Sequence, residues 1–235
     1  MSVLAIALSL LLGGGQAVDP GNGGARTGSR LDPDQRAIPN ADTSKADMTL
    51  YRLIECAVAR KGGRMRQLVD TRSEAEFQSA YGALGDVQRC SLDAYVAEEA
   101  DTVNFTADRG TVRGYVAEVF LKRDKPRVAG LAPLALQHVY LRDWYPMTGR
   151  AQAVDEMAVC VADINPQGIV ALIATEIGSK DQKAAIKPLL PSIGLCLSKT
   201  VRLTTNALGL RTALAEALYH RVYDAPPVAT EGTAK

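Results

Sequence analysis

Histidine is scarce in this sequence: His138 and His220 are the only two among 235 residues. Aromatic side chains are also few, with three Phe, eight Tyr and one Trp. Because histidine is a common zinc ligand and general base, two residues leave little material for a metal site or a proton relay. Cysteine pairs with zinc or redox spacing, a serine nucleophile elbow and glycine-rich phosphate loops are also missing. We therefore predict no metal site, no cofactor and no catalytic residue.

An excess of one charge is missing too. The chain has 27 Lys and Arg against 26 Asp and Glu, a net charge of +1. This balance carries no electrostatic signature of binding to nucleic acid or to an anionic membrane. Hydrophobic residues make up 47% and charged residues 23%, as is typical of globular chains. We expect a packed core and no nucleic-acid partner.

Long hydrophobic runs are limited to the start of the chain. Residues 3–12 are apolar except for one serine, and the small residues Gly15 and Ala17 follow. The run is too short to span a hydrocarbon core of about 30 Å, but it suits a signal peptide cleaved after Ala17. We predict a signal peptide over 1–17 and a periplasmic or secreted protein without an integral membrane segment after cleavage. Because no Lys or Arg precedes the run, a buried apolar strand is the alternative.

Two segments have too few large apolar side chains to form a core. Residues 18–45 are rich in Gly, Asp, Asn, Pro, Arg and Ser, and residues 225–235 begin with Ala-Pro-Pro-Val. Such segments bury too little surface to offset the entropy lost on ordering. We predict a disordered linker and a disordered tail.

Two distant segments share one helical pattern. Between Thr49 and Arg60, and again from Val154, apolar residues recur at intervals of three and four, which is typical of a helix with one buried face. Cys56 and Cys160 stand beside these apolar positions, 104 residues apart. The positions are Leu50, Leu53, Ile54, Ala57 and Val58 in the first segment and Val154, Met157, Ala158, Val161 and Ala162 in the second.

Two helix starts are repeated as well. Ser73 with Glu76, and Ser179 with Gln182, form capping boxes 106 residues apart, in which both side chains bind free N–H groups at a helix start. A cysteine follows each capping serine by 17 residues. Between serine and cysteine, both segments contain residues that break helices. The cysteines are Cys90 and Cys196, and the breakers are Gly82 and Gly85 in the first segment and Pro188 and Pro191 in the second.

A third pair of segments begins at Asp108 and Asn206, both favoured N-cap residues. Arg113, Ala117, Glu118 and Arg123 recur as Arg211, Ala215, Glu216 and Arg221. Three collinear pairs of segments indicate a duplication. We predict an all-α fold of two tandem copies of a roughly four-helix module in a pseudo-twofold arrangement. The copies span residues 46–123 and 152–224, with a connector over residues 124–151.

The order of these segments resembles a group of uncharacterised exported alphaproteobacterial proteins. In that group a cysteine-containing helix, a capping-box helix ending in cysteine, and a terminal helix with the pattern Leu-Arg-x-x-Leu-Ala-Glu-Ala-Leu-Tyr recur twice. Residues 210–219 match this pattern, whereas residues 112–121 depart from it at several positions. The resemblance implies a duplicated helical module and carries no known activity.

Four cysteines in an exported chain can form two disulfides in three ways. The duplication favours pairing within each copy, so we predict the bonds Cys56–Cys90 and Cys160–Cys196. If the chain is not exported, the four cysteines are instead small buried apolar side chains.

The repeated Arg and Glu are candidates for a ligand site. Arg113 and Glu118, like Arg211 and Glu216, are five residues apart, about 140° around a helix, and so cannot pair with each other. In one interpretation each arginine binds a carbonyl or carboxylate of its own copy and each glutamate faces solvent. In the other, both arginines converge at the pseudo-twofold seam and bind an anion.

The connector contains a cluster of apolar and aromatic residues between Arg127 and Tyr145, including Tyr140 and Trp144. It lacks a helical period, so short strands are possible. The cluster either covers the seam between the copies or forms an aromatic wall of a pocket. We therefore count Tyr140 and Trp144 as candidate ligand-binding residues.

These observations favour a non-catalytic binding or envelope-associated module, whose partner is an unknown protein or a small anionic ligand. The alternative is a small periplasmic hydrolase that uses His138 or His220 as a base. Candidate nucleophiles are Ser91, Ser192 and Ser198, although no motif links them to either histidine.

Overall fold

The computed structural model describes residues 43–82, 90, 107–197, 203 and 205–224. Throughout these residues the regular structure is helical, as the sequence predicts. The predicted signal peptide, the predicted tail and nearly all of the predicted linker lie outside the described residues. The first helix begins at Thr43, inside the predicted linker.

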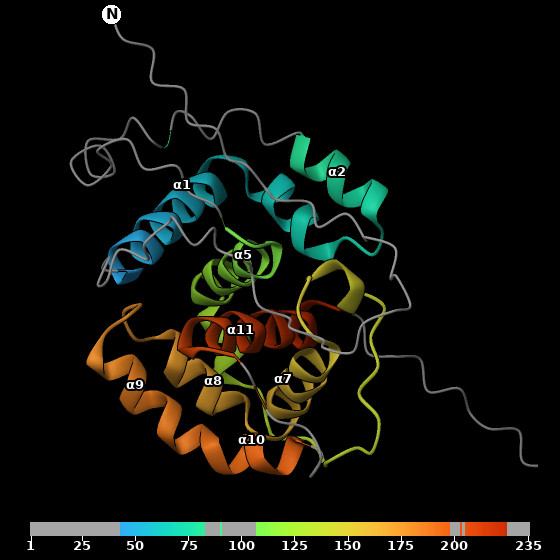
Figure 1. Cartoon of the computed structure of the whole chain (residues 1–235), viewed down its shortest axis with the longest axis vertical. Helices are drawn as coiled ribbons and strands as arrows, with labels where there is room; N and C mark the ends of the chain where they lie inside the picture. The colour runs from blue at the N-terminus through green and yellow to red at the C-terminus, as the bar shows by residue number, and fades with distance from the viewer. Residues whose placement is uncertain (1–42, 83–89, 91–106, 198–202, 204, 225–235) are drawn as a thin grey trace, which may run out of the picture.

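Two central helices, α5 (Arg109–Arg123) and α11 (Ala207–Tyr223), form the most extensive helix–helix contact (Figure 1). The predicted N-caps are confirmed: Asp108 accepts a hydrogen bond from the Thr111 N–H, and Asn206 accepts one from the Gly209 N–H. Both helices are buried on nearly every side, including Arg113 and Glu118 on α5 and Arg211 and Glu216 on α11. They are therefore core helices rather than surface helices with one apolar stripe.

The N-terminal part consists of α1 (Thr43–Asp70), which lies against α5, and α2 (Glu74–Gly82). Helix α1 extends beyond the predicted segment but changes direction at Lys61, whose backbone is not helical (φ −137°, ψ 41°). The predicted capping box of α2 is confirmed: the Glu76 N–H donates to Ser73 Oγ, and the Ser73 N–H donates to Glu76 Oε2.

The C-terminal part contains α7, α8, α9, η2 and α10. Asn165 caps α8 and Ser179 caps α9, each by accepting a backbone hydrogen bond. The predicted break at the prolines is confirmed, because α9 ends before Pro188 and a 3₁₀ turn separates it from α10. The bounds are Gln152–Ile164 for α7, Pro166–Ile173 for α8, Lys180–Ile186 for α9, Lys187–Leu189 for η2 and Leu190–Cys196 for α10.

The connector contains two short helices, α6 (Lys125–Ala129) and η1 (Tyr145–Met147). All residues between Arg127 and Tyr145 are described, and none of them forms a strand. The Leu134 N–H of this stretch donates to the Asp163 carbonyl near the end of α7, not to another extended segment. The strands that the sequence allowed are therefore not formed.

Helices α5 and α11 touch most closely at Gly114 and Thr212. A Cβ atom on Gly114 would lie 2.5 Å from the Thr212 carbonyl oxygen and 2.7 Å from its Cα. Such distances do not occur between real atoms, so only glycine fits here. Gly114 thus permits the close backbone approach that the central pair requires.

Both predicted disulfides are present. Cys56 is bonded to Cys90 with a Cα–Cα distance of 5.8 Å, and Cys160 is bonded to Cys196 with a Cα–Cα distance of 5.7 Å. The first bond joins α1 to Cys90, and the second joins α7 to the end of α10. No described cysteine is free.

Removing the second disulfide should destabilise the protein strongly. The bond links positions 36 residues apart, and the chain-entropy model assigns about 4 kcal/mol to a loop of this size. We expect Cys160→Ala/Cys196→Ala to lower the free energy of unfolding by about this amount in denaturant titrations. Mass analysis of non-reduced peptides checks the pairing, and a bond between the two halves of the chain would contradict it.

Adding one methyl group at the central crossing should also be costly. We expect Gly114→Ala to lower the free energy of unfolding by about 1–3 kcal/mol, because α5 and α11 must move apart. The matched control is Gly194→Ala in α10, where an added Cβ has no atom within 4 Å. Equal stability of Gly114→Ala and the control, measured by thermal denaturation, would contradict the close approach.

Candidate functional site

Two reciprocal arginine–glutamate pairs join the central helices. Arg113 Nε on α5 lies 2.6 Å from Glu216 Oε1 on α11. In return, Arg211 on α11 donates through Nε and Nη2 to both carboxylate oxygens of Glu118 on α5, at 2.8 and 2.7 Å. All four side chains are completely buried. The pairs therefore place four charges in the core of the protein.

The remaining N–H groups of Arg113 bind the C-terminal end of α1. Nη1 donates to the Leu68 carbonyl and to Thr71 Oγ1, at 2.8 and 2.6 Å, and Nη2 donates to the Val69 carbonyl at 2.6 Å. Carbonyl groups at a helix end lack partners within the helix and attract cations. Arg113 thus connects α1, α5 and α11.

Arg211 makes the corresponding contacts at the end of α8. Its Nη1 donates to Thr175 Oγ1 at 3.1 Å, and its Nη2 donates to the carbonyls of Ile173 and Thr175, at 3.1 and 2.8 Å. Nη1 also lies 3.3 Å from Gln182 Oε1. Arg211 therefore connects α5 and α11 to α8 and α9.

The two sets of contacts use residues that correspond in the repeated segments. Thr71 and Thr175 are 104 residues apart, as are Val69 and Ile173. Each threonine also donates its hydroxyl to the carbonyl three residues earlier. Two contacts of each arginine thus agree atom by atom: Nη1 donates to the threonine hydroxyl, and Nη2 donates to the carbonyl two residues before that threonine.

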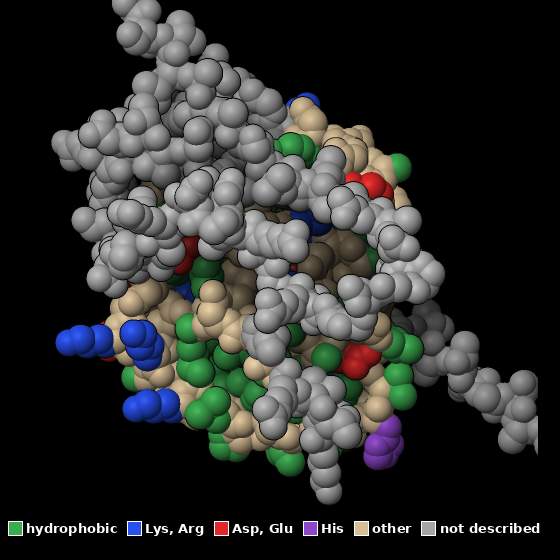
Figure 2. Space-filling model, viewed as in Figure 1, with side chains coloured by type: hydrophobic (Ala, Val, Ile, Leu, Met, Phe, Trp, Pro, Cys, Tyr) green, Lys and Arg blue, Asp and Glu red, His purple; other side chains and the backbone are tan. Residues whose placement is uncertain are grey.

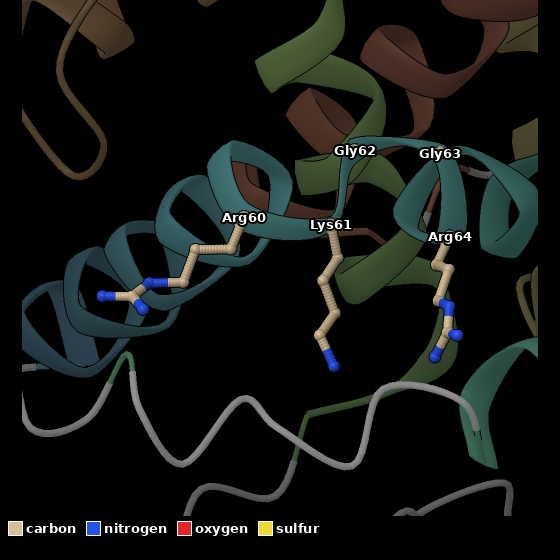
Figure 3. Close-up of a pocket in the computed structure, with 5 residues that line it drawn as sticks. All are labelled: Arg60, Lys61, Gly62, Gly63 and Arg64. Carbon is tan, nitrogen blue, oxygen red and sulfur yellow. The ribbon is translucent and has the colours of Figure 1, made fainter.

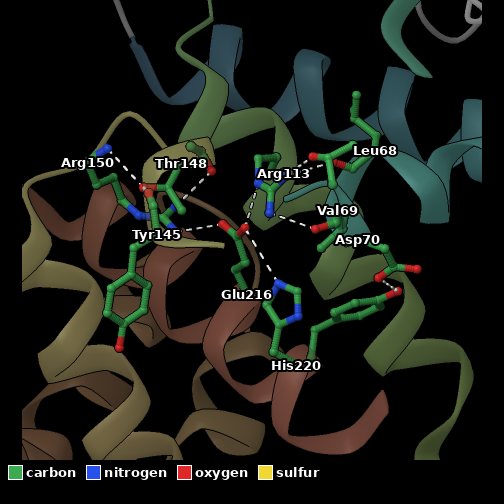
Figure 4. Close-up of polar contacts among 12 residues, drawn as sticks. Leu68, Val69, Asp70, Arg113, Tyr145, Thr148, Arg150, Glu216 and His220 are labelled. Carbon is green, nitrogen blue, oxygen red and sulfur yellow. Dashed lines mark hydrogen bonds and ion pairs between the residues drawn. The ribbon is translucent and has the colours of Figure 1, made fainter. Parts of the chain in front are cut away.

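A second cation lies beside each buried glutamate. Arg150 Nη2 is 2.6 Å from Glu216 Oε2, so Arg113 and Arg150 reach this carboxylate from two sides (Figure 4). Lys122 Nζ is 2.7 Å from Glu118 Oε1 and is partly exposed. Each carboxylate is therefore bound by two basic side chains.

These charges determine the pKa of Glu216. Burial by itself would raise the pKa of the carboxyl group, but Arg113 and Arg150 outweigh burial and lower it to about 2. Arg150 also binds Asp155 Oδ1 at 2.7 Å, and Thr148 Oγ1 donates to Asp155 Oδ2 at 2.7 Å. Burial nevertheless raises the pKa of Asp155 above its ordinary value.

His220 lies at the edge of this cluster. Its Nδ1 is 3.1 Å from Asp224 Oδ2, and its Nε2 is 3.9 Å from Glu216 Oε1, too far for a hydrogen bond. The ring stacks on Trp144 with centroids 4.4 Å apart. His220 Nε2 and Trp144 Nε1 are buried without a hydrogen-bond partner. In the described residues, no hydroxyl group binds His220 as a nucleophile would.

The structure places the predicted ligand residues in the core. Arg113, Arg211 and Trp144 are fully buried, and Tyr140 is buried as well. Tyr140 accepts a hydrogen bond from the Gln137 N–H, and its carbonyl accepts one from the Tyr145 hydroxyl. A ligand that bound either arginine would have to displace a buried glutamate. A ligand that reached Trp144 would have to move the connector.

Two interpretations of the arginines and glutamates are resolved by these contacts. Arg113 and Arg211 do bind helix-end carbonyls of their own half, as predicted. The expectation that Glu118 and Glu216 face solvent is wrong, because each binds the arginine of the other half. The anion that each arginine binds is thus a carboxylate of the chain itself.

The candidate catalytic residues are not gathered in one place. His138 is exposed on the connector, whereas His220 is buried against Trp144. Ser192 accepts a hydrogen bond from the Asn165 side chain. Ser91 and Ser198 lie outside the described residues.

Arg150, Asp155 and Lys122 complete the cluster but were not found from the sequence. Arg150 lies at the end of the connector, outside every repeated segment, whereas Asp155 lies near the start of α7 inside the second copy. Lys122 follows Glu118 by four residues, a spacing that favours ion pairs on a helix. This spacing was the one feature of the sequence that indicated an ion pair between Lys122 and Glu118.

A small basic pocket lies at the break in α1. The pocket has a volume of about 460 Å³ and is lined by Arg60, Lys61, Gly62, Gly63 and Arg64. The side chains of Lys61 and Arg64 project to the same side (Figure 3). All three basic residues already have interactions within the chain.

Groups of acidic, histidine or cysteine side chains suited to a metal ion are absent from the described residues. Within the same residues, no single helix has the length and apolar composition to cross a membrane. Helices α7 and α8 together pass that test but are bent by 106°. Comparisons with protein-family models, curated proteins and solved structures gave no match. The resemblance to exported alphaproteobacterial proteins therefore stays a prediction.

Acid should destabilise the protein through Glu216. Because its pKa in the folded chain, about 2, lies below the ordinary value of 4.5, ionised Glu216 stabilises the fold fully above about pH 4.5. This contribution is lost as the pH falls towards 2. We expect the melting temperature to fall over this range, and to fall less steeply in Glu216→Gln.

Asp155 has the opposite effect, because its raised pKa means that protonation favours the folded chain. Because the charge of Glu216 contributes to this raised pKa, the Gln variant also lowers the pKa of Asp155, and the comparison reports on the two coupled carboxylates together. Glu176→Gln, which removes an exposed carboxylate outside the cluster, is the control and should follow the wild type. Parallel profiles for Glu216→Gln and the wild type would contradict the assignment.

Proposed function

We propose that this chain is an exported, non-catalytic helical module that binds a protein or a small anionic ligand or associates with the cell envelope. The observation that carries the proposal is the pair of disulfides, which uses all four cysteines. Stable disulfides are typical of oxidising compartments outside the cytoplasm. They agree with the signal peptide predicted over residues 1–17.

The proposed module consists of two tandem copies, residues 46–123 and 152–224, related by a pseudo-twofold axis. The reciprocal pairs support this, since Arg113–Glu216 becomes Arg211–Glu118 when the two copies are exchanged. The contact between Gly114 and Thr212 also supports it, because these residues are 98 apart and correspond in the two copies. Residues on a twofold axis touch their own equivalents.

The use of the buried polar groups supports a non-catalytic role. The four central charges, on Arg113, Arg211, Glu118 and Glu216, bind one another and helix ends, and none of the four is exposed. Perturbed buried charges also occur in purely structural networks. The polar core thus holds the helices in place, and binding is assigned to the surface.

The second candidate function is a small periplasmic hydrolase that uses His138 or His220. One observation favours it for His220: Asp224 contacts Nδ1, while the buried Nε2 has no hydrogen-bond partner. A histidine oriented by a carboxylate is a usual general base. The base would still need a nucleophile and an open site.

Cell fractionation tests the proposal. The full chain carrying a C-terminal tag is expressed from its own start codon in a Gram-negative host, and the periplasm, membranes and cytoplasm are separated. We expect the oxidised protein, with both disulfides, in the periplasm or on the membranes, because export exposes the cysteines to oxidation. Affinity capture followed by mass spectrometry then identifies bound proteins.

Recovery of full-length protein in the cytoplasm with four free thiols would contradict the exported assignment. Turnover of ester, amide or phosphoester substrates that is lost in His220→Gln or His138→Gln would contradict the non-catalytic one. The two variants report on the two histidines separately, because His138 is exposed and His220 is buried.

A further inference from the structure

The segment formed by α9, η2 and α10 has one side fixed to the body of the protein and one side exposed. Gln182, Leu189 and Ile193 are buried, and Cys196 is bonded to Cys160 on α7. The exposed side is therefore held in a fixed position. A rigid surface loses little entropy when it binds a partner.

Three lysines lie on the exposed side of this segment. Lys180, Lys183 and Lys187 follow one another at intervals of three and four residues, so they share a helix face. All three are exposed, and across the described chain no carboxylate pairs with any of them. Asp181 is the only acidic residue between Lys180 and Cys196.

Exposed apolar residues follow directly after the lysines. Leu190 and Leu195 are 55% and 68% exposed. Pro191 and Gly194 are exposed between them, on the face turned away from Ile193. Figure 2 shows basic side chains projecting where Figure 1 places α9, with hydrophobic side chains beside them. The segment thus presents cations and apolar side chains together.

We propose that this α9–α10 surface binds an anionic lipid bilayer. The inference rests on the proposed function, since it specifies how an envelope-associated module would attach. Lysine ammonium groups attract anionic headgroups through charge, and their flexible stems reach the headgroups while neighbouring leucines enter the acyl boundary. The charge complementarity and the two exposed leucines identify a lipid surface as the occupant.

The net charge of the whole chain does not reveal this basic surface. The value of +1 sums the α9 lysines with carboxylates elsewhere in the chain. Because salt at 0.1 M screens charges beyond about 10 Å, only the charges near the membrane contribute to the attraction. The basic break in α1 is a weaker candidate. Its three cations already have interactions within the chain, and its lining contains no large apolar side chain.

Co-sedimentation with vesicles tests the inference. The oxidised full chain without its signal peptide is mixed with vesicles of phosphatidylcholine alone or of phosphatidylcholine with phosphatidylglycerol. We expect binding only to the anionic vesicles, weakened by 0.5 M salt. Lys180→Gln/Lys183→Gln/Lys187→Gln should bind roughly 100-fold more weakly, because each lysine near an anionic surface contributes about a fivefold factor. Leu190→Ser/Leu195→Ser should bind at least about tenfold more weakly.

Two matched variants control for general effects. Arg60→Gln/Lys61→Gln/Arg64→Gln removes three positive charges from the break in α1, and Leu134→Ser/Leu136→Ser removes two exposed leucines from the connector. Circular dichroism melts establish that every variant is folded. Both controls should bind like the wild type.

Equal binding to neutral and anionic vesicles, or equal losses in the controls and the α9–α10 variants, would overturn the inference. So would an absence of vesicle binding by a folded, oxidised protein. Capture of an acidic protein that the lysine variant no longer binds, without vesicle binding, would assign the surface to a protein instead. In each of these cases, export with both disulfides would leave the proposed function intact.

Discussion

The reciprocal ion pairs between α5 and α11 are the interaction on which the rest of the structure depends. Moving a charged group from water into a protein core costs several kcal/mol even after relaxation. Here that cost is offset because each glutamate has two cations and each arginine has a carboxylate and helix-end carbonyls as partners. Loss of one partner would leave a buried charge uncompensated. The contributions of these contacts to stability are therefore coupled.

The same contacts determine where the other helices lie. Arg113 binds the end of α1, Arg211 binds the end of α8, and Arg150 brings the end of the connector to Glu216. Hydrogen bonds require definite distances and directions, so they fix the position of one helix relative to another. The hydrophobic effect has no preferred direction and fixes that position less sharply. Neither half of the chain supplies both members of the Arg113–Glu216 pair or of the Arg211–Glu118 pair. Each half therefore depends on the other for the partner of its buried arginine.

The distribution of polar groups separates the core from the surface. Charged residues in the core form ion pairs within the chain. In the described structure the α9 lysines form no ion pair with a carboxylate, and the α10 leucines Leu190 and Leu195 are exposed. A disulfide holds this exposed segment to α7. Stability is thus concentrated in the central helices, and the exposed segment beside them is the part whose chemistry suits a partner.

The sequence by itself determined the helical class, the four helix caps and both disulfides, because caps and apolar periodicity are local and the repeated spacing limits the cysteine pairing. It also excluded pairing of Arg113 with Glu118, since five residues turn a helix by about 140°. Tertiary structure alone decided that each arginine takes the glutamate of the opposite helix, because that choice depends on how α5 and α11 cross at Gly114. The burial of Trp144 against His220 was decided in the same way. An irregular connector has no periodicity from which to infer what it covers.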